Sequence, residues 1–225
     1  MEENEILWGL SDSNTMEEVR EKAFSLIGQI QYIPAATVNG GQPENRILDF
    51  NRLSDGELYF MTSRGKPTYA QLSARPELVL NTLIDRRYSL RLRAWVSEVT
   101  DPAIWEEFFA RNPGTKLMYR KNLDIVVLFK LTSGEGEVFH LYEAERIRRM
   151  RFAFGGKKPL PMTYFISEAC TGCGICRENC VEQAIYQGGD GKYHIRDMDC
   201  DDCGICYTKC PSAGTALVSR LQNQF

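Results

Sequence analysis

Eight cysteines in two matching groups constrain this chain more than any other feature of its sequence. All eight lie between Cys170 and Cys210, and the 169 residues before them contain none. In each group, three cysteines are separated by two residues, and a fourth follows after three more. The chain begins with an acidic stretch instead of the basic and apolar segments of a secretory signal, so an extracellular disulfide scaffold is not expected. The cysteines therefore indicate metal ligation.

The two cysteine groups belong to a longer internal repeat. Upstream of the cysteines, Tyr164–Ile166 corresponds to Tyr193–Ile195, and downstream, Ala184-Ile185 corresponds to Ala216-Leu217. Glycines loosen both cysteine loops, so that three thiolates of one loop can point at one cluster. The repeat predicts a pseudo-two-fold fold with two equivalent sites.

Residues 162–225 resemble the bacterial two-cluster ferredoxins, and the resemblance implies two [4Fe–4S] clusters. In those proteins the fourth cysteine of each group ligates the other cluster, and we expect it to start a helix that faces away. The ligands so implied are Cys170, Cys173, Cys176 and Cys210 for one cluster, and Cys200, Cys203, Cys206 and Cys180 for the other. The usual proline follows Cys210, but Val181 follows Cys180. A pair of structural zinc sites is the alternative, although zinc modules seldom repeat this spacing.

The region before the cysteines has mainly strand patterns. Thr15 and Glu18 have the spacing of a capping box and predict the start of a helix. Two further helices are expected over Pro67–Ala74 and Pro102–Ala110, each led by a proline. The expected strands are Gln31–Val38, Arg46–Phe50, Glu57–Thr62, Leu78–Ile84, Ser89–Thr100, Asp124–Leu131 and Gly136–Tyr142, the last two separated by a turn at Ser133–Gly136. Seven short strands with few helices predict a closed antiparallel barrel.

A string of short segments in order carries a second resemblance: Arg46–Phe50, Leu58–Lys66, Gln71-Leu72 with Arg75–Leu80, and Leu90–Trp95. With them, the N-terminal region resembles the pyridoxamine 5′-phosphate oxidase-like split barrels that bind FMN. The fold class expected for the chain is therefore mainly β plus a small α+β part. It comprises an antiparallel split barrel with short helices, followed by a pseudo-two-fold ferredoxin module.

Six residues are the expected flavin contacts. Arg46 and Lys66 can pair with the FMN phosphate, and Ser63 can donate its hydroxyl to the same group. The resemblance implies that the backbone of Ile47, Met61 and Thr62 meets the polar edge of the isoalloxazine ring. Alternatively, each base is a solvated surface charge.

The resemblance also implies a homodimer through the barrel, but it does not carry over the vitamin substrate. The one histidine of this region, His140, lies in a strand pattern, so we expect a packed or edge position for it.

The domain organisation expected is a barrel over residues 1–143, a linker over 144–161 and the ferredoxin module over 162–225. A long surface loop within one domain is the alternative to the linker. The module has eight acids and five bases, whereas the first 161 residues are neutral, which argues against a nucleic-acid partner. The linker region is basic and either docks the acidic module or is solvated; its bases are Arg146, Arg148, Arg149, Arg151, Lys157 and Lys158.

The function expected is that of a flavin-dependent oxidoreductase. Two [4Fe–4S] clusters would relay electrons between FMN and an external carrier, with a redox protein or a small molecule as the reaction partner. One alternative is an electron-transfer protein without a substrate of its own. Another is the same fold with a deazaflavin or haem in place of FMN. No apolar run has the length of a membrane helix, so a cytoplasmic location is expected.

Overall fold

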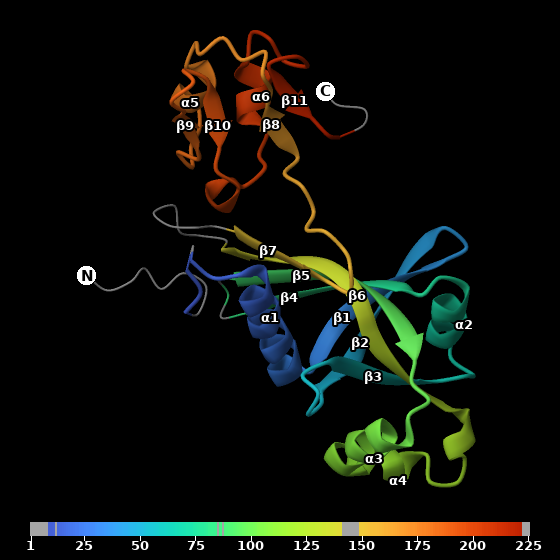
Figure 1. The fold of residues 1–225 in the computed structure, drawn as a ribbon. Coiled ribbons are helices and arrows are strands. Elements are labelled where there is room, and N and C mark those ends of the chain that lie inside the picture. The colour runs from blue at the N-terminus through green and yellow to red at the C-terminus, as the bar shows by residue number, and fades with distance from the viewer. Residues whose placement is uncertain (1–8, 12, 85, 87, 141–148, 222–225) are drawn as a thin grey trace. The chain divides into compact units, whose positions relative to one another are not determined.

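The computed structural model describes residues 9–11, 13–84, 86, 88–140 and 149–221 of the 225-residue chain (Figure 1). The chain divides into two compact units. One unit, the barrel unit, contains Ser13–Val138 and Arg151–Pro159. The other, the cysteine unit, contains Leu160–Phe225 together with residues 1–12 and 139–150. The two units are described separately below.

The barrel unit is built on one antiparallel sheet that closes on itself. Its strands run in the order β3-β2-β1-β4-β5-β6-β7, and an additional pairing of β3 with β6 closes the first six into a barrel. The strands are β1 (Tyr32–Asn39), β2 (Gln42–Arg52), β3 (Leu58–Ser63), β4 (Glu77–Ile84), β5 (Tyr88–Glu98), β6 (Val126–His140) and β7 (Arg149–Phe154). The last two residues of β6 and the first two of β7 belong to the cysteine unit. Inward-facing residues such as Ile33, Leu80 and Leu92 are fully buried. The predicted antiparallel barrel is thus confirmed.

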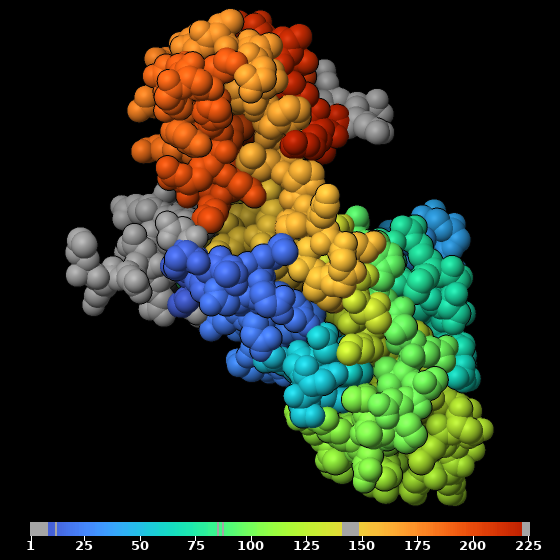
Figure 2. Space-filling view, in the orientation of Figure 1, coloured from blue at the N-terminus to red at the C-terminus, as the bar shows by residue number. Residues whose placement is uncertain are grey.

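Short helices cover the barrel, as the sequence predicts. The helices are α1 (Met16–Ile30), α2 (Pro67–Ala74), α3 (Pro102–Arg111) and α4 (Pro113–Met118), with a 3₁₀ turn at Leu123–Ile125. The predicted capping box is present: the Glu18 N–H donates to the Thr15 hydroxyl at 3.3 Å, and the Thr15 N–H donates to the Glu18 carboxylate at 2.7 Å. The space-filling view shows α1 (blue) and α3 with α4 (green) at the surface of this unit (Figure 2).

The turn predicted at Ser133–Gly136 is wrong, because β6 runs through it without a break. A Cβ at Gly134 would lie 2.6 Å from the carbonyl oxygen of Arg93, and one at Gly136 would lie 2.6 Å from the ring of Phe152. Both glycines are therefore required by close packing on β5 and β7. From the sequence alone, a glycine that is needed for close packing cannot be distinguished from a glycine in a turn.

Strand β7 lies within the segment expected to be a linker. It covers Arg149–Phe154 and extends the sheet beyond β6. Phe152 is fully buried, so this part of the segment is packed and is not a solvated linker. Residues 144–148 of the expected linker, and 141–142 of the last predicted strand, lie outside the described residues. The domain boundaries remain a prediction.

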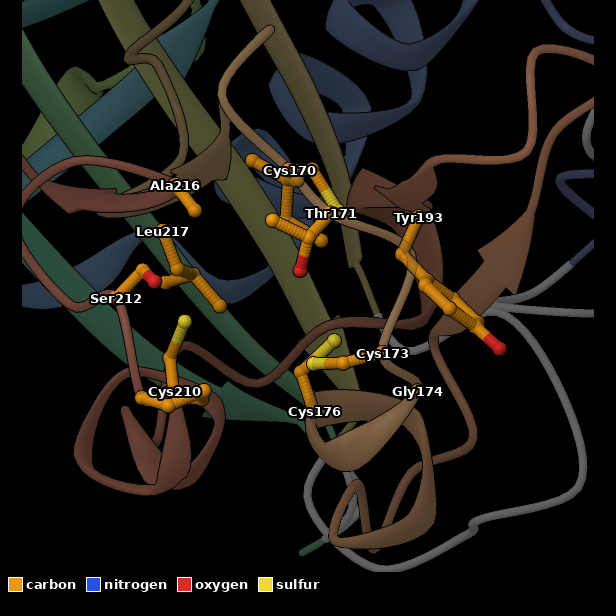
Figure 3. Close-up of a pocket in the computed structure, with 12 residues that line it drawn as sticks. Cys170, Thr171, Cys173, Gly174, Cys176, Tyr193, Cys210, Ser212, Ala216 and Leu217 are labelled. Atoms are coloured by element: carbon orange, nitrogen blue, oxygen red, sulfur yellow. The ribbon is translucent and has the colours of Figure 1, made fainter.

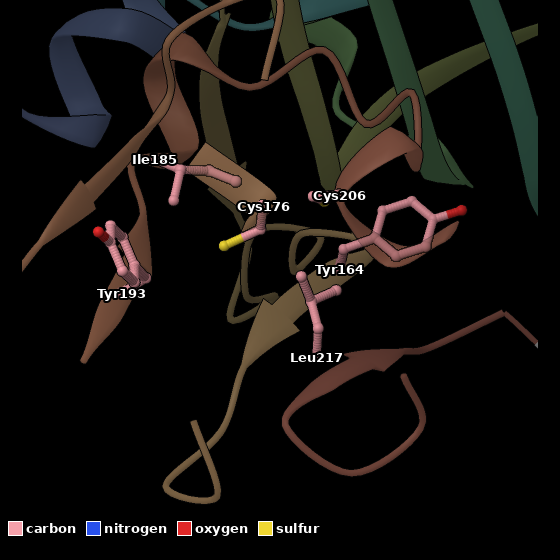
Figure 4. Close-up of a cluster of buried hydrophobic side chains, with 6 residues drawn as sticks. All are labelled: Tyr164, Cys176, Ile185, Tyr193, Cys206 and Leu217. Atoms are coloured by element: carbon pink, nitrogen blue, oxygen red, sulfur yellow. The ribbon is translucent and has the colours of Figure 1, made fainter. Parts of the chain in front are cut away.

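The part of the cysteine unit from residue 162 onward, called the cysteine module from here on, has the predicted pseudo-two-fold arrangement. Strand β8 (Tyr164–Ile166) pairs with β11 (Leu217–Ser219), and β9 (Ile185–Gln187) pairs with β10 (Tyr193–Ile195). The helices are α5 (Ile175–Glu178) and α6 (Ile205–Lys209), with a 3₁₀ turn at Asp197–Asp199. The buried core consists of three repeat-related pairs (Figure 4): Tyr164 with Tyr193, Cys176 with Cys206, and Ile185 with Leu217.

Candidate functional site

The eight cysteines line two hollows, four cysteines to each. The first hollow has Cys170, Cys173 and Cys176 from one loop and Cys210 from the other end of the repeat. Figure 3 shows these cysteines, with Cys176 on α5 and Cys210 after α6. The hollow has a volume of about 370 Å³, including space open to solvent.

The second hollow repeats this arrangement with the cysteines exchanged. Cys200, Cys203 and Cys206 come from the second loop, and Cys180 comes from the first group. Its volume, about 340 Å³, is close to that of the first hollow. The grouping of four and four is therefore the one that the sequence predicts for the cluster ligands, and ligation itself remains a prediction.

The helices differ from the sequence prediction in one respect. The fourth cysteine of each group was expected to start a helix, but Cys180 follows the end of α5 and Cys210 is the C-cap of α6. Instead, the third cysteines, Cys176 and Cys206, lie in the first turn of these helices. Each helix is so short that its cysteines at either end face different hollows.

The chemistry of these donors fits an iron–sulfur cluster. Thiolates are the ligands that such clusters use, and all eight cysteines are free of disulfides. Among the described residues, no three His, Cys, Asp or Glu side chains are close enough together to hold a single metal ion. Burial raises the pKa of Cys200 to about 11 and that of Cys206 to about 12, so bound iron would displace protons from these thiols.

The two cysteine loops have the same backbone turn but different side chains. In the first loop, the N–H of Gly172 donates to the Cys170 sulfur at 3.5 Å. In the second, the N–H of Asp202 donates to the Cys200 sulfur at 3.4 Å. Both residues have a left-handed backbone, with φ of +73° at Gly172 and +61° at Asp202.

The Asp202 side chain is bound on both carboxylate oxygens. It accepts a hydrogen bond from Thr163 N–H at 3.1 Å and forms an ion pair with Arg149. Arg149 is only 3% exposed and lies over the ring of Phe139 at 5.0 Å. Of the bases expected in the linker, Arg149 is thus paired with an acid of the cysteine module, while Arg146 and Arg148 lie outside the described residues.

On the barrel, Arg46 lies in a partly buried polar network that adjoins α2. Its guanidinium donates to the Thr37 hydroxyl and, at 2.9 Å, to the side-chain oxygen of Gln71 on α2. Glu44 completes the network, at 3.3 Å from Arg46 and 2.6 Å from the Gln71 amide. The sequence points to Arg46 but not to Thr37, Glu44 or Gln71. Glu44 is only two residues from Arg46 but belongs to no motif, and Gln71 comes from another element 25 residues away.

Two of the other expected flavin contacts, Ser63 and Lys66, lie next to the start of α2. Lys66 is the exposed N-cap residue of this helix, and Ser63, 6% exposed, ends β3 just before it. Met61 and Thr62 lie on the same strand, opposite Leu128 and Val127 of β6. Ile47 lies on β2 and is 56% exposed. Lys66 and Ser63 thus offer a positive charge and a hydroxyl beside the start of α2, and such donors suit a phosphate.

His140, which was expected at a packed or edge position, is 4% exposed at the end of β6. This burial agrees with a packed position.

The cysteine module matches a known family. Residues 169–215 match the model of the 4Fe–4S dicluster domain family. This match confirms the predicted resemblance of the module to ferredoxins with 4Fe–4S clusters. No curated protein matches the chain.

The barrel is similar to solved structures at low sequence identity. A NimC/NimA family protein from Clostridium acetobutylicum is 20% identical, with a TM-score of 0.52, over 60% of this chain and 91% of that one. A protein assigned as a pyridoxamine 5′-phosphate oxidase from Listeria innocua is 19% identical, with a TM-score of 0.41, over 50% and 91%. The haem storage protein HutZ from Vibrio cholerae is 17% identical, with a TM-score of 0.40, over 52% and 89%. The first likeness, together with the closed six-stranded pairing, confirms the split-barrel fold.

No helix among the described residues is both long enough and apolar enough to cross a membrane.

Proposed function

We propose that this chain is a flavin-dependent oxidoreductase in which two [4Fe–4S] clusters exchange electrons with FMN on the barrel. The observation that carries the proposal is the gathering of eight cysteines into two groups of four around similar hollows. The family match over residues 169–215 supports the same chemistry. Clusters transfer single electrons, and a flavin connects them to two-electron substrates.

In this proposal the cysteines hold the clusters in crossed sets. Cys170, Cys173, Cys176 and Cys210 hold the first cluster, and Cys180, Cys200, Cys203 and Cys206 hold the second. The ligand pattern of two-cluster ferredoxins supports the exchange of Cys180 and Cys210. Both groups must then be folded against each other before either cluster has four ligands.

The FMN phosphate would bind at the start of α2. Lys66 supplies a charge there and Ser63 supplies a hydroxyl. Pro67 has no N–H, and the N–H groups of Tyr69 and Ala70 donate to the Lys66 carbonyl, so the Thr68 N–H would be the amide donor of the first turn. Gln71 holds Arg46 against the same helix, where its charge favours an anion even though Glu44 partly offsets it. The backbone of Ile47, Met61 and Thr62 would contact the ring.

A second copy of the chain would cover an apolar face of the barrel. Ile47 on β2 lies opposite Pro34 on β1, and Ala36 on β1 lies opposite Val79 on β4. Ile47 and Val79 are 56% and 41% exposed, and Leu83 on β4 is also exposed. An exposed apolar face of this kind favours association, and its inclusion of Ile47 joins it to the proposed flavin site.

The flavin site is tested by comparing FMN with riboflavin, which lacks the phosphate. Lys66→Ala should weaken FMN binding about ten- to hundredfold, because one charge-assisted hydrogen bond is lost, and should leave riboflavin binding nearly unchanged. Lys121→Ala is the matched control, since Lys121 is an exposed lysine outside the proposed site. Equal weakening of both ligands would show that Lys66 is structural.

The relay is tested by anaerobic stopped-flow with a donor that reduces the clusters. Flavin absorbance should fall after cluster absorbance in the intact protein and fall more slowly in Cys173→Ala. A flavin that never accepts electrons from reduced clusters would favour an electron-transfer protein without its own substrate. Extraction of a deazaflavin or haem in place of FMN would assign the barrel to that cofactor instead.

Dimerisation is tested by light scattering of the purified protein. Val79→Asp should shift the mass toward a monomer by placing a charge on the apolar face. Leu117→Asp, at a 61% exposed position on α4, should not shift it. A wild-type monomer would contradict the proposed interface.

A further inference from the structure

The two cysteine loops are related by the repeat, but their charges differ. Thr171 and Gly172 stand between the first two cysteines of the first loop, whereas Asp201 and Asp202 stand at the same positions in the second. The second loop therefore has two carboxylates next to its cysteines. Two clusters bound by otherwise equivalent loops would experience different local fields.

Asp202 occupies a backbone conformation that normally favours glycine. Its φ of +61° is left-handed, a region that residues with side chains rarely occupy and that Asp and Asn enter more often than the others. Its counterpart Gly172 has no room for a side chain, because a Cβ there would lie 2.7 Å from the carbonyl oxygen of Gly191. The second loop thus has room for a side chain where the first has none, and both carboxylate oxygens of that side chain are bound, one by Arg149 and one by the Thr163 N–H.

The cation at the second loop is shielded from water. Arg149 is 3% exposed and Asp202 is 19% exposed at the side chain. Near the first loop, Lys192 pairs with Glu168, but these side chains are 29% and 94% exposed. Water and salt screen the exposed pair far more than the buried one, so the two cations differ in their effect on a nearby charge.

We propose that Arg149 and Asp202 together set the reduction potential of the second cluster independently of the first, and so fix the order in which the clusters accept electrons. The inference depends on the two clusters of the proposed function. Reduction adds one negative charge to a cluster, which a nearby cation favours and a nearby carboxylate opposes. Arg149 raises the potential of the second cluster, and Asp202 lowers it while holding Arg149 in place.

The opposite signs of the two charges give a direct test. Potentiometric titration followed by EPR would measure both cluster couples in the purified, cluster-loaded protein. Arg149→Gln should lower the reduction potential of one cluster, and Asp202→Asn should raise the reduction potential of the same cluster. Each change should alter the electron-exchange equilibrium between the clusters about tenfold, which is about 59 mV for one electron. The other couple should stay in place.

Two variants separate charge from structure. Arg149→Lys keeps the charge and should keep most of the wild-type potential, even though it loses the planar guanidinium. Lys192→Gln removes the exposed cation and should move neither couple by more than a third of the Arg149→Gln shift. If Arg149→Gln fails to retain its clusters, the Asp202→Asn and Arg149→Lys titrations still decide.

The outcomes distinguish this inference from the function on which it depends. Shifts of both variants in the same direction, equal shifts of both couples, or no shift in fully loaded variants would overturn the inference and leave the relay standing. Wild-type protein without iron and labile sulfide would overturn the proposed function itself. Iron and sulfide analysis of every variant therefore accompanies the titrations.

Discussion

Two glycines related by the repeat allow a controlled test of how tightly the cysteine module is packed. Gly174 and Gly204 are the N-cap residues of α5 and α6, with φ of +85° and +78°. A Cβ at Gly204 would lie 2.6 Å from the hydroxyl and 2.9 Å from the ring carbon Cζ of Tyr164. A Cβ at Gly174 would lie 3.2 Å from the hydroxyl of Tyr193 and 3.7 Å from its Cζ. The two positions thus share backbone strain but differ in packing.

Alanine at either glycine adds the same left-handed strain, about 1–2 kcal/mol. Only Gly204→Ala adds a severe overlap, and Tyr164 cannot move away freely because it is 3% exposed in the core. Overpacking a core by one methyl group costs about 1–3 kcal/mol. Gly204→Ala should therefore destabilise the module by about 1–3 kcal/mol more than Gly174→Ala.

The assay is the rate at which an iron chelator removes the clusters anaerobically, followed by visible absorbance. If the chelator needs a locally opened loop, the rate of cluster loss follows the opening equilibrium. A difference of about 1–3 kcal/mol then corresponds to about a 5- to 150-fold faster loss from Gly204→Ala than from Gly174→Ala. Adding Tyr164→Phe removes the nearest atom and should recover part of the difference in Gly204→Ala. Equal rates in the two alanine variants would refute this account of the packing.

Three further predictions concern both units. Anaerobically purified protein should contain about eight iron and eight labile sulfide per chain, and Cys173→Ala should remove one cluster and spare most of the other, by iron analysis and EPR. Burial and the hydrogen bond to Asp55 raise the pKa of Tyr59. The protonated Tyr59 side chain therefore contributes its full share to the free energy of unfolding below about pH 10, and this share is lost as the pH rises further. Tyr59→Phe should therefore show a smaller fall in urea midpoint between about pH 9 and about pH 11 than the wild type. Thr15→Ala removes the cap of α1 and should lower barrel stability by about 1 kcal/mol in urea unfolding, whereas Gln29→Ala at an exposed position of the same helix should not.

The elements of the barrel that depend on local signals could be predicted from the sequence. The capping box at Thr15 and the proline at the start of α2 gave helices that the structure contains. Gly134 and Gly136 misled the prediction, because a glycine required by a neighbouring strand has the same local signature as a glycine in a turn. Strand β7 was missed because its basic residues resemble a solvated stretch, while its burial depends on distant partners.

The candidate sites also include residues that local motifs predict and residues that only the tertiary structure brings together. The cysteine spacing was sufficient to group the residues that line each hollow, since the repeat and the ferredoxin resemblance fix which loops face each other. The network around Arg46 could not be predicted, because Thr37 and Gln71 are 9 and 25 residues away from it and show no motif. The pairing of Arg149 with Asp202 joins residues 53 positions apart and depends on tertiary structure alone.

The closure of the barrel by β3 and β6 has a consequence for how the chain folds during synthesis. Tyr59 pairs with Lys130 and Ser63 pairs with Val126, so the closing contacts join segments more than sixty residues apart. At about 5–20 residues per second, a ribosome needs several seconds to make the intervening chain. During that time the outer edge of β3 has no partner strand and is open to pairing with another chain. Folding of the barrel is therefore expected to be slow, with aggregation most probable in nascent chains that end before residue 130.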